Sequence, residues 1–127
     1  MKKQTLIAIH NNGGGAFHFD LLRPFWQDSI NFAALNLPGC AGSHWKDELN
    51  NINDFLIHLN HEINLFNQDN LPLVLLGHGS GALLALKYAK LFPVKSLILH
   101  SPSNNNSWLN QGFLLNLKNN FLSMEAF

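Results

Sequence analysis

Short apolar runs alternate along the chain with longer segments in which apolar residues recur at every third or fourth position. Four of these runs have the length and the flanking turn residues of strands: Thr5–Ile9 and residues 31–37, 71–76 and 94–99. The run at 71–76 is apolar almost throughout, which is typical of a central strand in a parallel sheet that is covered on both faces.

The segments between the runs have the apolar spacing of one face of a helix. The first, from Phe17 to Trp26, contains Pro24 late enough to shorten or kink a helix. Another begins near residue 81 and stops at Pro93. The longest lies between these two, and its apolar residues fall within a narrow arc at about 100° per residue. They are Trp45, Leu49, Ile52, Leu56, Leu59, Ile63 and Phe66.

This alternation of strand and helix predicts an α/β fold with right-handed crossovers. We expect a three-layer sandwich around a short parallel sheet of about four strands. Residues 1–102 would form this core. Residues 103–127 begin with a polar stretch and continue with spaced apolar residues such as Trp108, Phe113 and Phe121, which predict a helical tail.

Composition narrows the class of protein. The chain has 127 residues, enough for one domain, and its 8 Lys+Arg balance its 8 Asp+Glu, which argues against a nucleic-acid-binding protein. Its single cysteine, Cys40, excludes a disulfide within the chain. No apolar run approaches the roughly 20 residues of a membrane span or forms a secretory signal. We expect a cytoplasmic protein, and no cofactor is indicated.

A glycine-rich turn at residues 77–82 (GHGSGA) separates the third expected strand from the helix that follows it. Two kinds of site use such a turn: the nucleophile elbow, G-x-S-x-G, and the dinucleotide fingerprint, G-x-G-x-x-G/A. The fingerprint also requires an Asp or Glu about 20 residues later, at the end of the next strand. That strand ends at residues 99–101 (LHS) without an acid, so the elbow is the better interpretation.

Three motifs follow the ends of the first three expected strands. Residues 10–14 (HNNGG) resemble H-G-x-G-G, and residues 37–43 (LPGCAGS) resemble D-x-P-G-x-G-x-S. Residues 76–82 (LGHGSGA) resemble L-x-G-H-S-x-G-G/A. In this order they are similar to the oxyanion loop, the second loop and the elbow of the α/β-hydrolase superfamily, whose N-terminal half the chain resembles over roughly residues 5–102. The resemblance implies hydrolysis of esters, thioesters or amides.

The resemblance also implies roles for individual residues. The backbone N–H groups of Asn12 and Ser80 would form the oxyanion hole, and His10 and Gly13 belong to the binding loop. His78 would precede the nucleophile, and Gly79 would stand at the nucleophile position. The implied ligand is a small acyl ester or thioester.

Two departures from the family predict absent or impaired hydrolysis, as in a truncated pseudoenzyme. Gly79 has no side chain, and loss of the nucleophile costs a serine hydrolase about a million-fold in rate. The family's acid and base histidine normally follow the fourth of these strands, soon after which this chain ends. We expect Gly79→Ser to be structurally acceptable, at about 1–2 kcal/mol for a residue in a sparsely populated backbone region.

Other residues are candidates for the missing groups. Ser80 lies one position after the elbow position, where a serine more often only caps a helix. His100 closes the fourth strand, at the edge of the sheet where α/β proteins bind ligands, and is the best general-base candidate within the chain. For His10 we expect a structural hydrogen bond. His58 and His61 have no third ligand nearby, so no metal site is predicted.

An incomplete sheet points to a second class of function. The resemblance implies an eight-stranded sheet, of which the four expected strands would be the third to the sixth, in the spatial order second, first, third, fourth. The fourth strand would then be an exposed edge with apolar faces. Because a homodimer contact, a partner chain or the tail must cover such an edge, the alternative function is a non-catalytic scaffold or interaction protein.

Overall fold

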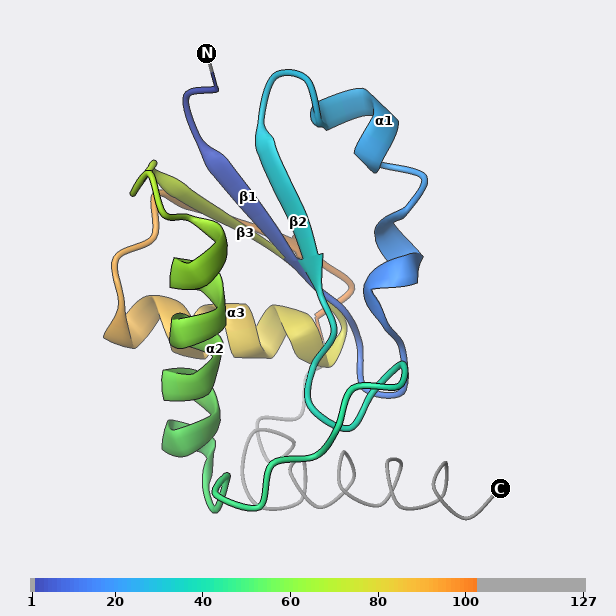
Figure 1. Ribbon diagram of the computed structural model, residues 1–127, viewed down its shortest axis with the longest axis vertical. Coiled ribbons are helices and arrows are strands. Elements are labelled where there is room, and N and C mark those ends of the chain that lie inside the picture. The colour runs from blue at the N-terminus through green and yellow to red at the C-terminus, as the bar shows by residue number, and fades with distance from the viewer. Residues whose placement is uncertain (1, 103–127) are drawn as a thin grey trace.

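A parallel sheet of four strands forms the middle layer of the structure, a computed structural model that describes residues 2–102 (Figure 1). Its strands are β1 (Thr5–Ile9), β2 (Asn31–Leu35), β3 (Leu73–His78) and β4 (Ser96–His100). They lie in the order β2-β1-β3-β4, and each neighbouring pair is parallel. The fold class and the strand order expected from the sequence are both confirmed.

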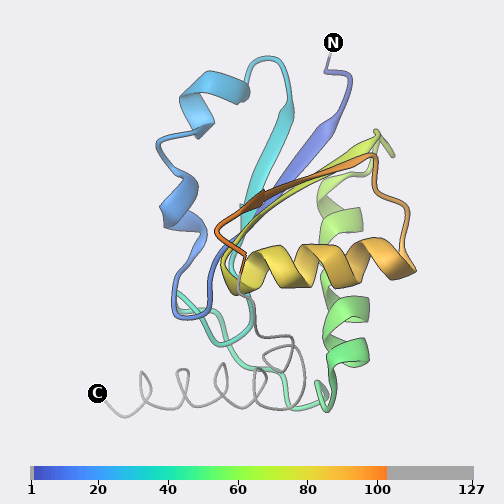
Figure 2. The same cartoon turned by 180° about the vertical axis from the view of Figure 1, so that it is seen from behind.

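Helices cover the two faces of the sheet unequally (Figures 1 and 2). The long helices α2 (Ile52–Phe66) and α3 (Ser80–Leu91) pack on one face over the larger apolar cluster. The short 3₁₀ helix η1 (Ala16–Phe19) and the single-turn helix α1 (Arg23–Trp26) pack on the other face over a smaller cluster. Sheet and helices together make the three layers.

The segment expected to form one helix from Phe17 to Trp26 is instead two short helices, η1 and α1. Pro24 explains the break, because proline lacks the N–H of a helix interior and is tolerated only in the first turn. It lies in the first turn of α1. The apolar side chains of Leu21 and Phe25 consequently point into solvent.

The expectation that the longest helix begins near Trp45 is also wrong, because α2 begins only at Ile52. Asn51 caps it: the Asn51 side chain accepts a hydrogen bond of 2.9 Å from the Asp54 backbone N–H. Trp45 and Leu49 still pack against the core, but from the loop before the helix. Apolar periodicity therefore identified core residues correctly and the helix boundary incorrectly.

Strand boundaries differ from the expected ones by one or two residues. The third strand begins at Leu73 rather than residue 71 and extends to His78, and the fourth begins at Ser96 rather than residue 94. The second ends at Leu35 rather than residue 37. The extension of β3 to His78 brings the strand directly to the glycine turn. The expected tail, residues 103–127, lies outside the described residues.

The position of each strand in the sheet determines its burial. All five residues of β1 are buried, because the strand lies between β2 and β3 and is covered on both faces. In β4 only Leu97 is partly buried, while Ile98 and Leu99 expose 44% and 37% of their surfaces. The described residues thus leave β4 as an apolar edge strand.

Candidate active site

The turn between β3 and α3 has the geometry of a nucleophile elbow. Gly79 has φ 60° and ψ −121°, a conformation that side-chain-bearing residues rarely adopt. The strand ends immediately before it at His78, and the helix begins immediately after it at Ser80. The sparsely populated backbone conformation expected at residue 79 is confirmed.

Close packing accounts for the two other glycines of the turn. A Cβ on Gly77 would lie 2.6 Å from the carbonyl oxygen of Gly81, and a Cβ on Gly81 would lie 2.6 Å from that of His10. Backbone atoms cannot yield to such contacts. Glycine at both positions lets the start of α3 reach the end of β1, which brings the loop at residues 10–14 against the elbow.

The Ser80 hydroxyl joins these two loops. It donates a hydrogen bond of 2.9 Å to Asn11 Oδ1 and accepts one of 2.8 Å from the Asn12 backbone N–H. The side chain is also buried, since only 3% of Ser80 is exposed. Neither partner is a base that could take the hydroxyl proton, so this geometry resembles a structural bridge rather than an activated nucleophile.

The two backbone donors expected for the oxyanion hole lie close together, and each already has an acceptor in the chain. Asn12 N–H donates to Ser80 Oγ, and Ser80 N–H donates to Asn11 Oδ1 at 2.9 Å. A substrate carbonyl would therefore have to replace these acceptors to receive both hydrogen bonds.

Asn11, which the motifs did not single out, lies against the nucleophile position. A Cβ built on Gly79 would lie 2.6 Å from Asn11 Cγ and closer still to Asn11 Oδ1. A side chain at residue 79 would therefore displace the Asn11 amide, and the expectation that Gly79→Ser is structurally acceptable, at about 1–2 kcal/mol, stays a prediction. The only signal in the sequence is that Asn11 replaces the first glycine of H-G-x-G-G.

The His10 side chain connects the loop at residues 10–14 to the loop at residues 37–43 by hydrogen bonds. It is completely buried; its Nδ1 lies 2.7 Å from the Asn11 carbonyl oxygen, and its Nε2 accepts a 3.0 Å hydrogen bond from the Leu37 backbone N–H. Burial lowers the pKa of His10, which favours the neutral ring with its proton on Nδ1. The expected structural hydrogen bond is present.

Two further loop residues complete this part of the site. Gly13 has φ 82° and turns the oxyanion loop through a region where a Cβ would meet no atom within 4 Å. Cys40 is buried and reduced, and burial raises the pKa of its thiol despite a hydrogen bond with the Gly13 backbone. A high thiol pKa disfavours the thiolate, so Cys40 has the character of a packing residue.

His78 and His100 meet at the carboxyl ends of β3 and β4. They are paired in the sheet register, their Nδ1 atoms lie 2.8 Å apart, and their rings stack with centroids 4.9 Å apart. One Nδ1 must carry a proton and the other accept it. The His100 carbonyl oxygen also accepts a 3.0 Å hydrogen bond from the Gly79 N–H, so this pair adjoins the elbow.

An open apolar pocket of about 590 Å³ lies beside the histidine pair, on the face of the sheet that η1 and α1 cover. Its lining residues are His18, Phe19, Leu21, Leu22, Trp26, Leu76, His78, Ile98 and His100. The pocket opens at the carboxyl ends of β3 and β4, where open α/β sheets bind their ligands. Its lining surface is mostly apolar.

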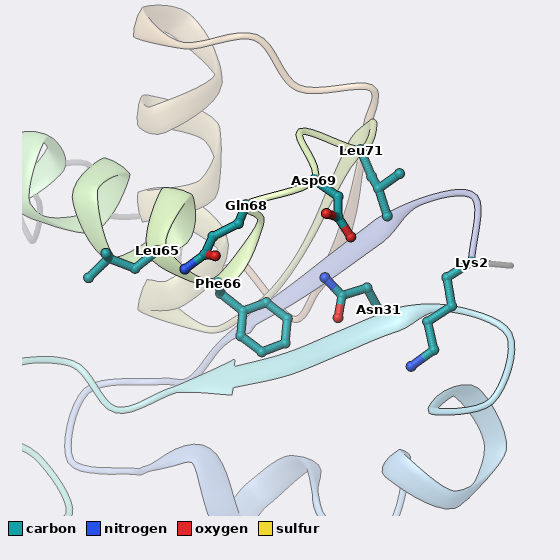
Figure 3. A pocket seen from close by; sticks show the side chains of 7 residues that line it. All are labelled: Lys2, Asn31, Leu65, Phe66, Gln68, Asp69 and Leu71. Atoms are coloured by element: carbon teal, nitrogen blue, oxygen red, sulfur yellow. The ribbon is translucent and has the colours of Figure 1, made fainter.

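A larger hollow of about 750 Å³ lies at the opposite end of the sheet (Figure 3). It is lined by Lys2, Asn31, Leu65, Phe66, Gln68, Asp69 and Leu71. These residues flank the amino ends of β1 and β2 and the end of α2, away from the elbow. Its position makes it a poorer candidate for the active site, despite its size.

Clustered metal ligands and membrane-spanning helices are both absent from the described residues. Among residues 2–102, no three His, Cys, Asp or Glu side chains come close enough to hold a metal ion together. Each helix in this part of the chain is too short or too polar to cross a lipid bilayer. His58 lies near Glu62, with Nε2 and Oε1 3.8 Å apart, rather than in a cluster with His61.

Solved structures of larger proteins share this fold. MenH from S. aureus matches with a TM-score of 0.72 and 23% identity, over 81% of this chain and 39% of its own. A proline iminopeptidase-related protein from Thermus thermophilus matches with a TM-score of 0.60 and 24% identity, over 84% and 39%. The thioesterase domain from the curacin biosynthetic pathway matches with a TM-score of 0.60 and 20% identity, over 95% and 46%.

This chain therefore spans less than half the length of these three relatives. No protein of curated function matches its sequence significantly. The family model of the thioesterase domain matches residues 4–100, which include every strand of the sheet and the elbow. The chain belongs to the thioesterase domain family, within the α/β-hydrolase superfamily.

Proposed function

We propose that this chain binds acyl thioesters at the elbow and does not form an acyl-serine intermediate. The observation that carries the proposal is a fully built elbow without a nucleophile: Gly79 has no side chain, and the neighbouring Ser80 hydroxyl is buried and bonded to Asn11 and Asn12. Membership of the thioesterase domain family supports a thioester rather than another acyl compound.

The apolar pocket supports the acyl half of this proposal. A carbonyl placed at the Asn12 and Ser80 N–H groups would have the pocket within reach, because His78 and His100 line it and adjoin the elbow. The thioester carbonyl would take the two backbone hydrogen bonds, and the acyl chain would lie along Leu76 and Ile98.

Labelling with a fluorophosphonate probe tests the absence of a serine nucleophile. We expect no stoichiometric labelling of the purified chain, and we expect any thiol release from a butyryl thioester to proceed by direct attack of water. In thioester hydrolysis the water oxygen bonds to the carbonyl carbon, the C–S bond breaks, and the sulfur gains a proton. Rapid labelling that Ser80→Ala abolishes and Ser43→Ala preserves would identify Ser80 as the nucleophile and overturn the proposal.

A matched pair on β4 tests the acyl pocket. Ile98 lines the pocket, whereas Leu99 is the next residue, similarly exposed, and points to the other face of the sheet. We expect Ile98→Asp to weaken binding of a non-hydrolysable octanoyl ketone analogue at least about tenfold, the cost of placing an acid beside an apolar chain. Leu99→Asp should leave binding unchanged. Equal effects of the two substitutions would contradict the pocket assignment.

The exposed edge favours a second candidate, an interaction protein. The apolar residues Ile98 and Leu99 of β4 remain open to solvent among the described residues, and an edge strand offers unpaired N–H and C=O groups. A second copy of the chain could pair with this edge, which predicts a dimer in light scattering after size exclusion. A monomer at high micromolar concentration would count against this candidate and leave thioester binding untouched.

The expected cellular location is part of the same proposal. Cys40 is free and buried, and the chain has no second cysteine with which to form a disulfide. This fits the reducing environment of the cytoplasm. Cell fractionation of the tagged chain tests it, and recovery from a secreted or periplasmic fraction would contradict it.

A further inference from the structure

The Asn11 side chain fills the space that a side chain on residue 79 would need. Strand register explains how the two residues meet: β1 pairs with β3 so that Ile9 lies opposite Gly77, and two residues further along each chain come Asn11 and Gly79. A Cβ on Gly79 would overlap the end of the Asn11 amide, with Cγ at 2.6 Å.

Asn11 is held in place through both its backbone and its side chain. Its backbone carbonyl oxygen accepts a 2.9 Å hydrogen bond from the Gly14 N–H and lies 2.7 Å from His10 Nδ1. Its Oδ1 accepts two hydrogen bonds of 2.9 Å, one from Ser80 N–H and one from Ser80 Oγ. Every buried side-chain nitrogen and oxygen within residues 2–102 has a hydrogen-bond partner, and the Asn12 and Ser80 backbone N–H groups have theirs in Ser80 Oγ and Asn11 Oδ1.

We propose that Asn11 and Gly79 are a compensating pair, in which the Asn11 amide occupies the elbow and its oxygen takes the place of a ligand carbonyl. Asn11 Oδ1 is itself a carbonyl oxygen, and it already accepts the Ser80 N–H that an acyl ligand would use. A ligand must displace it to reach that donor. Only this last step rests on the proposed function; the pairing of Asn11 with Gly79 stands independently.

Thermal unfolding of Gly79→Ser tests the overlap. Gly42→Ser is the matched control, because Gly42 has φ 80° and a Cβ there would meet no atom within 4 Å. Both variants place a serine at positive φ, but only Gly79→Ser collides with Asn11. We expect its Tm to lie about 5 °C or more below that of Gly42→Ser. Equal Tm values would overturn the overlap.

The change in Tm caused by adding Asn11→Gly should have opposite signs in the Gly42→Ser and Gly79→Ser backgrounds. In Gly42→Ser it removes the acceptor of the Ser80 hydrogen bonds and should lower Tm. In Gly79→Ser it makes room for the new side chain and should raise Tm. Glycine is chosen over alanine because Asn11 Cβ would itself lie 3.2 Å from the new Cβ. Additive effects in the two backgrounds would overturn the pairing.

Amide hydrogen exchange gives a readout that does not depend on any Gly79 variant. We expect Asn11→Ala to speed exchange of the Ser80 N–H at least about tenfold, because its acceptor is lost. Asn11→Asp, which keeps an acceptor oxygen near the start of α3, should preserve protection. The Thr5 N–H, bonded to the Pro72 carbonyl oxygen at the other end of the sheet, is the internal control. Unchanged Ser80 protection in Asn11→Ala would overturn the proposal.

These measurements separate this inference from the proposed function. If the chain fails to bind any acyl thioester but Asn11→Gly still rescues Gly79→Ser, the compensating pair is supported and thioester binding is not. If Asn11→Gly strengthens binding of the octanoyl ketone analogue, the amide competes with the ligand for Ser80 N–H, as proposed. Weaker binding in Asn11→Gly would show that the amide assists the ligand and would overturn the displacement step.

Discussion

The two faces of the sheet differ in how completely helices cover them. Under α2 and α3, the side chains of Phe55, Leu75 and Leu84 are entirely shielded from solvent. On the other face, η1 and α1 have only four residues each, and Phe25 exposes 79% of its surface. The open apolar pocket lies on this second face. One face therefore supplies most of the buried core, and the other leaves room for a ligand next to the elbow.

This division places the elbow where the two faces meet. Gly81 packs the start of α3 against β1 on the covered face, while the His78 ring points into the pocket on the open face. A rigid elbow needs the first contact, and access to a ligand needs the second. Substitutions on the two faces should therefore have different consequences, in stability on one and in binding on the other.

The largest difference is expected between two phenylalanines. Phe55→Ala removes a completely buried ring from the covered face and should lower the free energy of unfolding by about 3–5 kcal/mol. Phe25→Ala removes a mostly exposed ring from the open face and should change it by no more than about 0.5 kcal/mol. Urea denaturation measures both. Similar losses would mean that the open face is as well packed as the covered one.

Gly81→Ala tests the contact that joins the elbow to the covered face. Helix propensity alone predicts that alanine stabilises this first turn of α3 by about 0.5–1 kcal/mol. The close approach to the His10 carbonyl oxygen predicts the opposite sign, a loss of about 1–3 kcal/mol. A stabilised variant in urea denaturation would refute the close approach.

A smaller effect is expected for the hydrogen bond between the two long helices. Tyr88 is buried, and its hydroxyl donates a 2.7 Å hydrogen bond to Asn60 Oδ1. Tyr88→Phe should cost about 0.5–1.5 kcal/mol. Burial raises the pKa of Tyr88 to about 12, so the unfolded chain should ionise first and stability should fall between about pH 10 and 12. The Phe variant should show a weaker decline than the parent, and identical declines would exclude Tyr88 as its source.

The pH dependence near neutrality should report the buried histidine behind the elbow. Burial lowers the pKa of His10 below its ordinary value of about 6.5, so the unfolded chain binds the proton more readily. Its contribution to stability is constant above that pH and is lost as the pH falls below it. His58 acts in the same direction, chiefly through burial, and His58→Gln removes its share. If the stability of the His58→Gln protein rose as the pH was lowered from 7 to 5, the lowered pKa of His10 would be contradicted.

Local pattern was enough to predict the parallel sheet and the position of the glycine turn, whereas the strand order was predicted from the resemblance to the α/β-hydrolase superfamily. Alternating apolar runs and amphipathic segments restrict the topology to a few choices, and a glycine between strand and helix permits the positive φ found at Gly79. Helix boundaries were predicted less well. Pro24 broke the first helix and the Asn51 cap delayed the second, although Leu49 still reached the core.

The contents of the site were decided by the tertiary structure. Asn11 meets Gly79 because β1 and β3 pair in one register, and His78 meets His100 because β3 and β4 pair in another. A shift of one residue in either register would turn these side chains to opposite faces of the sheet. Sequence spacing does not encode that register, since it depends on how the whole core packs. The sequence by itself determined a glycine turn after β3 with Gly79 at its centre, and the pairing of strands decided that the Asn11 amide lies against that glycine.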